Sequence, residues 1–127
     1  MLSFPHALTI YLHRAPVDMR KSFDGLFGII KNEHAMDVRQ GGLFMFINLR
    51  RNRVKLMYWD RDGIAIWQKR LERGRLQHPQ PSGDAKHLVI DADELHLLLV
   101  GIELSSVKRR KRYVVPELPP IATNKNS

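Results

Sequence analysis

The chain has 127 residues, 43% hydrophobic and 27% charged, which fits one globular domain with a single core and excludes a wholly disordered chain. Twenty-one lysines and arginines outnumber thirteen acids, and the net charge of +8 favours polyanionic partners. The chain has no cysteine, which excludes disulfides and thiolate zinc sites and is typical of the reducing cytoplasm, where we expect the protein. The N-terminal residues "MLSFPHALTIYLHRAP" lack a basic start and a small-residue cleavage site, so we expect no signal peptide, and no apolar run approaches the roughly 20 residues that cross a membrane.

The basic charge is concentrated in two blocks. Residues 50–75 hold nine bases and three acids, net +6, and residues 108–112 add +5, whereas residues 1–49 carry +1 and residues 76–107 carry −4. Such asymmetry is typical of nucleic-acid-binding proteins, although a solvated basic face produces the same count. The second block lies in a stretch rich in charge and proline, so we expect one domain over residues 1–104 and a flexible basic tail over residues 105–127.

The N-terminal part predicts one strand followed by one helix. In "ALTIYLHRA", residues 7–15, alternate apolar side chains predict a strand that ends at Pro16. In "DMRKSFDGLFGIIKNE", residues 18–33, apolar residues recur at helical spacing, and Asp18 stands where a helix N-cap is expected. We expect this helix to pack through Phe23, Phe27 and Ile30.

The middle of the chain predicts a three-stranded meander. The unbroken apolar run "LFMFINL", residues 43–49, is typical of a strand buried on both faces. A tight "RRNR" connection leads to "VKLMYWD", and "DRDG" then turns into "IAIWQKRLERG", with Asp62-Gly63 as the dipeptide that hairpin turns with positive φ prefer.

After a loop, "HLVI" at residues 87–90 suggests a short strand, and residues 91–102 predict a helix capped by Asp91, with Asp93 and Glu94 in its first turn. The predicted fold class is therefore α+β: a small antiparallel sheet, made of the N-terminal strand and the meander, packed with two helices.

Catalysis is not indicated. The carboxylates Asp60, Asp62, Asp91, Asp93 and Glu94 are the residue types that a metal-dependent nuclease needs, but turn and cap preferences already account for them. The six histidines show no ligand spacing, and no phosphate-binding loop or nucleophile motif occurs. We expect no enzyme, no metal and no cofactor, with a small nuclease as a distant alternative.

The meander instead predicts a nucleic-acid surface. One sheet face mixing Trp59 and Trp67 with lysines would offer base-stacking surfaces beside phosphate-binding cations; the alternative is that both tryptophans pack under a helix. The candidate phosphate-binding residues are Arg50, Arg51, Arg53, Lys55, Lys69, Arg70, Arg73 and Arg75, with Arg20 and Lys21 on the outer face of the first helix. The tail bases Lys108, Arg109, Arg110, Lys111 and Arg112 are the least specific candidates.

Two stretches carry a family resemblance. "PVDMRKSFDGL" and "LFMFINLRRNRVKLMYWDRDGIAIWQKRLERGRL" resemble the accessory TnpB protein of the insertion-sequence-sixty-six family of bacterial transposons, which is distinct from the RNA-guided nucleases of the same name. The resemblance spans most of residues 8–101 and departs from the family at Ile47, Leu49 and the His78-Pro79 pair. It implies a small protein encoded beside a larger transposase that performs the chemistry, with DNA and that transposase as partners.

The residues and the resemblance together predict a non-catalytic accessory protein of DNA transposition that binds nucleic acid through its basic meander. The alternative is an adapter that assembles the transposase without touching DNA. It is supported by the apolar runs "LFMFINL" and "ELHLLLVGI", which would serve it if they left an exposed face. Oligomeric state and strand preference stay open.

Overall fold

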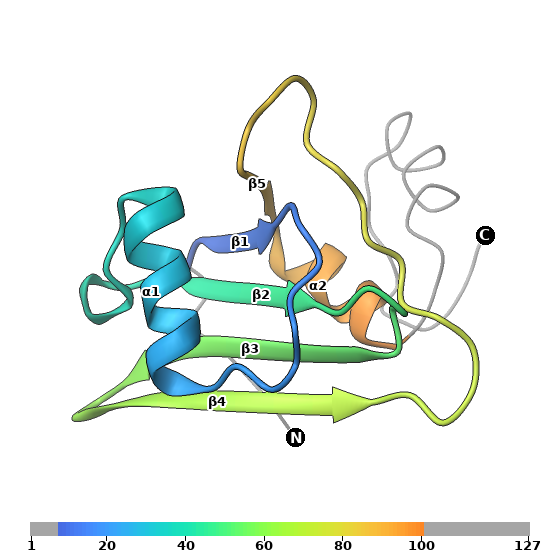
Figure 1. Cartoon of the computed structure of the whole chain (residues 1–127), viewed down its shortest axis with the longest axis horizontal. Helices are drawn as coiled ribbons and strands as arrows, with labels where there is room; N and C mark the ends of the chain where they lie inside the picture. Colours follow the sequence, from blue (N-terminus) through green and yellow to red (C-terminus); the bar gives the residue numbers. More distant parts are fainter. Residues whose placement is uncertain (1–7, 101–127) are drawn as a thin grey trace.

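A five-stranded sheet carries one helix on each face (Figure 1). The computed structural model describes residues 8–100, and the predicted tail lies outside them. In chain order the elements are β1 (Ile10–His13), α1 (Phe23–His34), the 3₁₀-helix η1 (Val38–Gln40), β2 (Leu43–Ile47), β3 (Arg53–Asp60), β4 (Gly63–Arg70), β5 (His87–Ile90) and α2 (Ala92–Leu99).

The strand order is β4-β3-β2-β1-β5. The predicted meander is confirmed, because β2, β3 and β4 pair antiparallel in sequence order. β1 lies parallel to β2, an arrangement that requires a crossover connection, which α1 supplies. β5 pairs antiparallel with the outer edge of β1. The predicted α+β class is confirmed, with one parallel pair inside an otherwise antiparallel sheet.

β2 is buried on both faces, as its apolar run predicts. Leu43, Met45 and Ile47 contribute to the core under α2, whereas Phe44 and Phe46 contribute to the core under α1. Each of the five strand residues is at most 2% exposed. The central strand therefore requires a cover on each side, which the two helices provide.

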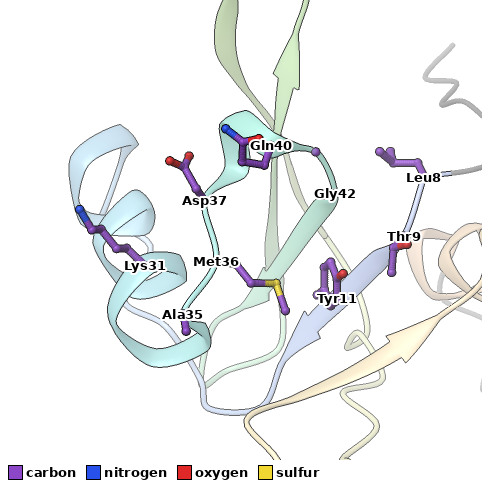
Figure 2. Close-up of a pocket in the computed structure, with 10 residues that line it drawn as sticks. Leu8, Thr9, Tyr11, Lys31, Ala35, Met36, Asp37, Gln40 and Gly42 are labelled. Carbon is purple, nitrogen blue, oxygen red and sulfur yellow. The ribbon is translucent and has the colours of Figure 1, made fainter.

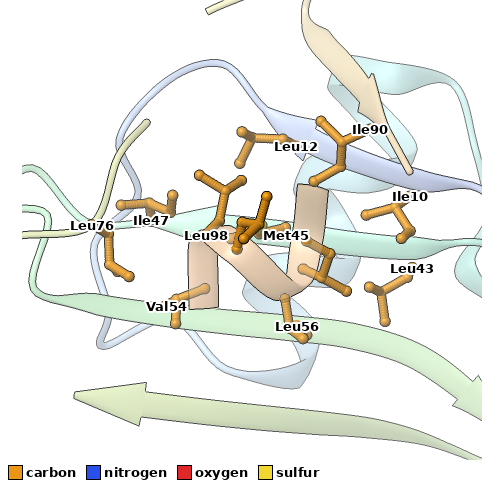
Figure 3. Packing of buried hydrophobic residues seen from close by; sticks show 12 residues of the cluster. Ile10, Leu12, Leu43, Met45, Ile47, Val54, Leu56, Leu76, Ile90 and Leu98 are labelled. Atoms are coloured by element: carbon orange, nitrogen blue, oxygen red, sulfur yellow. The ribbon is translucent and has the colours of Figure 1, made fainter. Parts of the chain in front are cut away.

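The α2 side holds the larger apolar cluster (Figure 3). Alternate residues of neighbouring strands share this face because side chains alternate along a strand. Leu98 and Leu95 of α2 pack onto them, and Leu76 from the loop after β4 closes one end. The buried members are Ile10, Leu12, Leu43, Met45, Ile47, Val54, Leu56, Leu76, Ile90, Leu95, Leu97 and Leu98.

α1 begins later than the sequence predicts, and of its three predicted packing residues Ile30 is buried, Phe27 is partly buried and Phe23 is exposed. Ser22, not Asp18, occupies the N-cap position, and Ser22 makes no side-chain capping bond. The carboxylate of Asp18 is instead engaged by Arg20 within a turn that precedes the helix. The prediction for Phe23 is also wrong, since it is 47% exposed; Leu26 and Ile30 are the buried residues of α1.

Gly42, between η1 and β2, lies close to the ring of Tyr11 on β1 (Figure 2). Gly42 has φ = +92°, and a Cβ at this position would lie 3.0 Å from Cε2 of Tyr11 and 3.3 Å from Cε1 of Phe44. Tyr11 stacks on Phe44 with 5.0 Å between ring centroids. Only glycine combines this left-handed conformation with the space that β1 and β2 leave.

The β3–β4 hairpin turns one residue earlier than predicted. Asp60 pairs with Gly63, so the two-residue loop is Arg61-Asp62, and Arg61 carries the positive φ of 59°. Gly63 is the first residue of β4. This loop length determines the register of the whole β3–β4 pair.

α2 begins as predicted. The side chain of Asp91 accepts from the backbone N–H of Glu94 at 2.7 Å, and the side chain of Glu94 accepts from the backbone N–H of Asp91 at 2.9 Å. This reciprocal capping box satisfies two N–H groups of the first turn.

No helix within residues 8–100 is long and apolar enough to cross a membrane.

Replacing Leu98 by alanine tests the packing of α2 on the sheet. Leu98 is fully buried, so we expect the free energy of unfolding to fall by about 2–5 kcal/mol in urea denaturation. His96→Ala on the exposed side of the same helix serves as the control and should change stability by about 0.5 kcal/mol or less. Equal stability of the two variants would contradict the packing.

Candidate nucleic-acid interface

The topology gathers basic side chains at one end of the sheet. β2 ends there, β3 begins there, and β4 ends there, because the three strands run antiparallel. The backbone N–H of Leu71 donates to the carbonyl of Asn52, and that of Leu76 donates to the carbonyl of Arg51, so segment 71–76 lies against the β2–β3 turn. We call this region the basic end; its residues are Arg50, Arg51, Arg53, Arg70, Arg73 and Arg75.

The β2–β3 turn is internally braced. The side-chain oxygen of Asn48 accepts from the backbone N–H groups of Asn52 (3.0 Å) and Arg53 (2.9 Å), and its amide donates to Oδ1 of Asn52 at 2.7 Å. Arg51 adopts a left-handed conformation with φ = +58°. The turn therefore has a defined shape before any ligand binds.

Most guanidinium groups of the basic end have no partner in the described part of the chain. Arg70 pairs with Glu72 at 3.2 Å, an exposed contact. The other five residues of the basic end make no side-chain hydrogen bond or ion pair with residues 8–100. Like charges held close together repel one another, so an anion bound here would relieve the repulsion.

The opposite end of the sheet carries five of the acids that the sequence singles out. Asp60 and Asp62 lie at the β3–β4 turn, and Asp91, Asp93 and Glu94 follow the end of β5 at the start of α2. Asp91 caps the helix, as its sequence position predicts, together with Glu94. Within residues 8–100, no three histidine, aspartate or glutamate side chains are placed to hold a metal ion.

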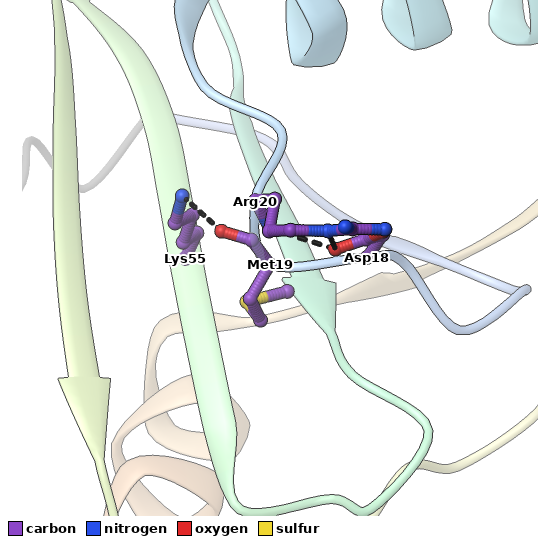
Figure 4. Close-up of polar contacts among 4 residues, drawn as sticks. All are labelled: Asp18, Met19, Arg20 and Lys55. Carbon is purple, nitrogen blue, oxygen red and sulfur yellow. Dashed lines mark hydrogen bonds and ion pairs between the residues drawn. The ribbon is translucent and has the colours of Figure 1, made fainter.

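Lys55, a predicted phosphate-binding residue, is not on the surface (Figure 4). Its side chain is buried, and its ammonium donates to the backbone carbonyls of Met19 at 2.9 Å and Lys21 at 2.7 Å. Burial, and secondarily the charge of Arg53, lower the pKa of Lys55. Lys55 therefore anchors the segment before α1 and contributes nothing to an exposed interface.

The other predicted bases on strands and loops remain accessible. Lys69 is exposed and donates to the carbonyl of Leu99 at the end of α2, 2.9 Å away. Arg20 forms a two-point ion pair with Asp18, and these bonds lower the pKa of Asp18 to about 2. Lys21 is exposed beside Arg20. The tail bases Lys108, Arg109, Arg110, Lys111 and Arg112 lie outside the described residues.

The two tryptophans lie on opposite faces of the sheet, so the predicted mixed face does not exist. Trp67 pairs with Leu56 and packs, half-buried, against the cluster under α2. Trp59 pairs with Ile64 on the α1 face and is 39% exposed. Of the two, Trp59 is the one with a ring available to a ligand.

Three histidines from three separate elements form a hydrogen-bonded chain. Nδ1 of His13 in β1 lies 2.8 Å from Nε2 of His34 in α1, and Nδ1 of His34 lies 3.0 Å from Nδ1 of His87 in β5. His34 uses a different ring nitrogen for each neighbour, so the three rings do not converge on one point. Sequence reasoning missed this chain because residues 13, 34 and 87 have no common spacing.

Burial lowers the pKa of two members of the histidine chain. Desolvation by burial, assisted by the neighbouring rings, lowers the pKa of His34 to about 4, and desolvation also lowers the pKa of His13. Glu33, 3.9 Å from Nε2 of His13, acts in the opposite direction, while Lys86 adds to the lowering. The chain thus joins the end of α1 to β1 and β5.

The chain matches one known protein family over most of its length. Residues 8–109 match the family described as IS66 Orf2 like protein. The chain belongs to this family. The resemblance carried by "PVDMRKSFDGL" and the meander is therefore confirmed, and membership implies an accessory role associated with transposition.

Similar proteins occur in Sinorhizobium fredii. The uncharacterized protein y4jC is 30% identical over 110 residues, which cover 87% of this chain and 92% of the relative. The uncharacterized protein y4hO is 28% identical over 103 residues, which cover 81% and 88%. No solved structure matches the chain at a significant level.

Replacing Lys55 by methionine tests its anchoring role. Methionine retains most of the apolar stem but leaves the carbonyls of Met19 and Lys21 without their donor, so we expect unfolding to become easier by about 1–3 kcal/mol. Lys86→Met, at an exposed lysine, is the matched control and should change stability by about 0.5 kcal/mol or less. Unchanged stability of Lys55→Met, measured by urea denaturation, would disprove the anchor.

The histidine chain predicts that acid destabilises the fold. Unfolded histidine has a pKa near 6.5 and folded His34 one of about 4, so between these values the unfolded state binds more protons. The free energy of unfolding therefore falls as the pH falls, by up to about 1.4 kcal/mol per pH unit from His34 alone. Urea denaturation across this range should show a flatter profile for His34→Gln, whereas His96→Gln should follow the wild type; identical profiles for all three would refute the assignment.

Proposed function

We propose that the protein is a non-catalytic accessory protein of DNA transposition that binds DNA through the basic end. The observation that carries the proposal is the collection of five guanidinium groups without a partner in residues 8–100, held on a braced turn and the segment packed against it. The planar guanidinium group of arginine can donate two parallel hydrogen bonds to the oxygens of one phosphate. Contacts of this kind position a protein on DNA and carry little sequence information.

The uneven distribution of charge between the two ends of the sheet supports DNA binding at the basic end. The end of the sheet that carries the β3–β4 turn and the start of α2 mixes acids with bases, whereas the basic end holds six arginines and one nearby acid, Glu72, so a polyanion is attracted more strongly to the basic end. The basic end therefore defines which surface would face the DNA. Lys69 and Arg20 lie on structure adjoining it and would extend the contact.

The non-catalytic part of the proposal follows from the uses of the carboxylates. Asp91 and Glu94 are engaged in the capping box, and Asp60 and Asp62 lie at the tight turn whose loop is Arg61-Asp62. The family resemblance assigns the chemistry of strand transfer to the larger transposase. That transposase is accordingly the second partner that we propose.

Most of the apolar residues that motivated the adapter alternative are buried. The strand residues of "LFMFINL" lie in the two cores, and in α2 Leu95, Leu97 and Leu98 are buried as well. Within residues 8–100, Leu49 and Val100 are the exposed large apolar residues of the two runs, and an adapter would use them. Co-purification with the transposase in high salt after nuclease treatment, without any DNA binding by the isolated protein, would favour the adapter.

The salt dependence of DNA binding tests the proposed interface. If about five bases contact phosphates, the logarithm of affinity should fall against the logarithm of salt concentration with a slope near −4.5, measured by fluorescence anisotropy. Replacing Arg50, Arg51 and Arg53 together by alanine should flatten the slope by about three. The fold should persist, because these side chains make no hydrogen bond or ion pair with residues 8–100.

A second triple variant with the same net charge shows whether the position of the lost charges, and not only their number, determines the salt slope. Lys31, Arg39 and Arg61 lie at the far end of the sheet, on the α1 side or in the β3–β4 turn, and their triple alanine variant loses the same formal charge. Its salt slope should stay close to that of the wild type. Equal flattening in the two triple variants would reject the basic end as the interface.

A further inference from the structure

A hollow of about 670 Å³ opens beside the basic end. One wall is the segment 16–20 that precedes α1, and the other is the β2–β3 turn. Arg20 projects from the first wall, Arg50 and Arg53 from the second, and Leu49 contributes an apolar side chain. Ligand pockets for small organic groups commonly have volumes of about 300–1,000 Å³, so a nucleotide fits the size of this hollow.

Both walls are held in place from inside the protein. The backbone N–H of Val17 donates to the carbonyl of Ile47 at 3.0 Å, which ties the segment to the end of β2. Buried Lys55 binds the carbonyl of Met19 (Figure 4) and that of Lys21, and Asn48 braces the turn on the other side. The hollow is therefore preorganised, which reduces the entropy lost when a ligand binds.

The lining combines cations with surfaces suited to the face of a base. Leu49 is 79% exposed, more than any other large hydrophobic residue described. The two bonds from Arg20 to Asp18 orient the guanidinium plane, and a guanidinium plane stacks on nucleobases. Duplex DNA presents phosphates on its outside but hides the faces of its bases, so an exposed leucine adds nothing to duplex binding.

We propose that this hollow binds an unpaired nucleotide of a DNA strand, with the base against Leu49 and Arg20 and the adjoining phosphates on Arg50 and Arg53. The inference rests on the proposed DNA binding and adds a preference for single-stranded over duplex DNA. Charge complementarity selects this occupant: three arginines line the hollow, and its one carboxylate, that of Asp18, is already paired.

The test compares two forms of one DNA sequence. A labelled strand of about 16 nucleotides, the upper site size of many single-strand binding domains, is titrated alone and as a blunt duplex, with affinity measured by fluorescence anisotropy. Stacking of one base on an aromatic ring contributes about 5- to 150-fold in affinity, and a leucine beside a guanidinium offers a smaller surface, so we expect the full-length protein to bind the single strand about tenfold more tightly.

Two variants with matched controls locate the preference in the hollow. Leu49→Ala should weaken single-strand binding about fivefold and leave duplex binding unchanged, whereas Val89→Ala, at an exposed apolar residue on edge strand β5, should change neither. Arg20→Lys keeps the charge and loses the plane, so it should weaken single-strand binding at an unchanged salt slope. Arg39→Lys is its control, because Asp37 and Arg39 repeat the Asp18–Arg20 geometry away from the hollow.

The outcomes separate this inference from the proposed function. Equal affinity for the two DNA forms, or a single-strand preference that survives both Leu49→Ala and Arg20→Lys, overturns the nucleotide site while the basic end keeps its role. Failure to bind either form overturns the proposed function and the nucleotide site together. A preference that both variants remove and both controls retain supports the site.

Discussion

The structure depends on the burial of β2 from both sides. A strand whose residues are all apolar must be covered on two faces, so α1 and α2 take opposite sides of the sheet and each completes a core. With both faces covered at the centre, exposed cations project mainly from the ends and edges of the sheet. The basic end is thus a consequence of how the core is built as well as of where arginines occur in the chain.

Buried Lys55 links that core to the surface. Its ammonium replaces lost hydration with two backbone carbonyls, and these belong to the segment that precedes α1. The segment is thereby held beside the β2–β3 turn, where Arg20 faces Arg50 and Arg53 across the hollow. The sequence predicts that Lys55 binds phosphate at the surface, but in the structure Lys55 is buried and holds the segment that lines the hollow.

The sequence by itself determined the elements and their chemistry. The unbroken run at residues 43–49, the alternation in β1 and the Asp91 helix cap are local patterns, and each has its counterpart in the structure, although the buried strand ends at Ile47 and Leu49 is exposed. The accumulation of arginine around residues 50–75 is likewise visible without coordinates. Local patterns succeed here because backbone geometry couples residues that are two, three or four positions apart.

Only the tertiary structure decided which side chains share a surface. A loop of two residues between β3 and β4 places Trp59 and Trp67 on opposite faces, whereas a loop one residue longer would place them together. The start of α1, the burial of Lys55 and the chain of His13, His34 and His87 likewise depend on contacts between distant segments. The physical reason is that alternation along a strand shows only that successive side chains point to opposite faces of the sheet. The register between strands and the packing of distant segments determine which residues share a face and what covers them.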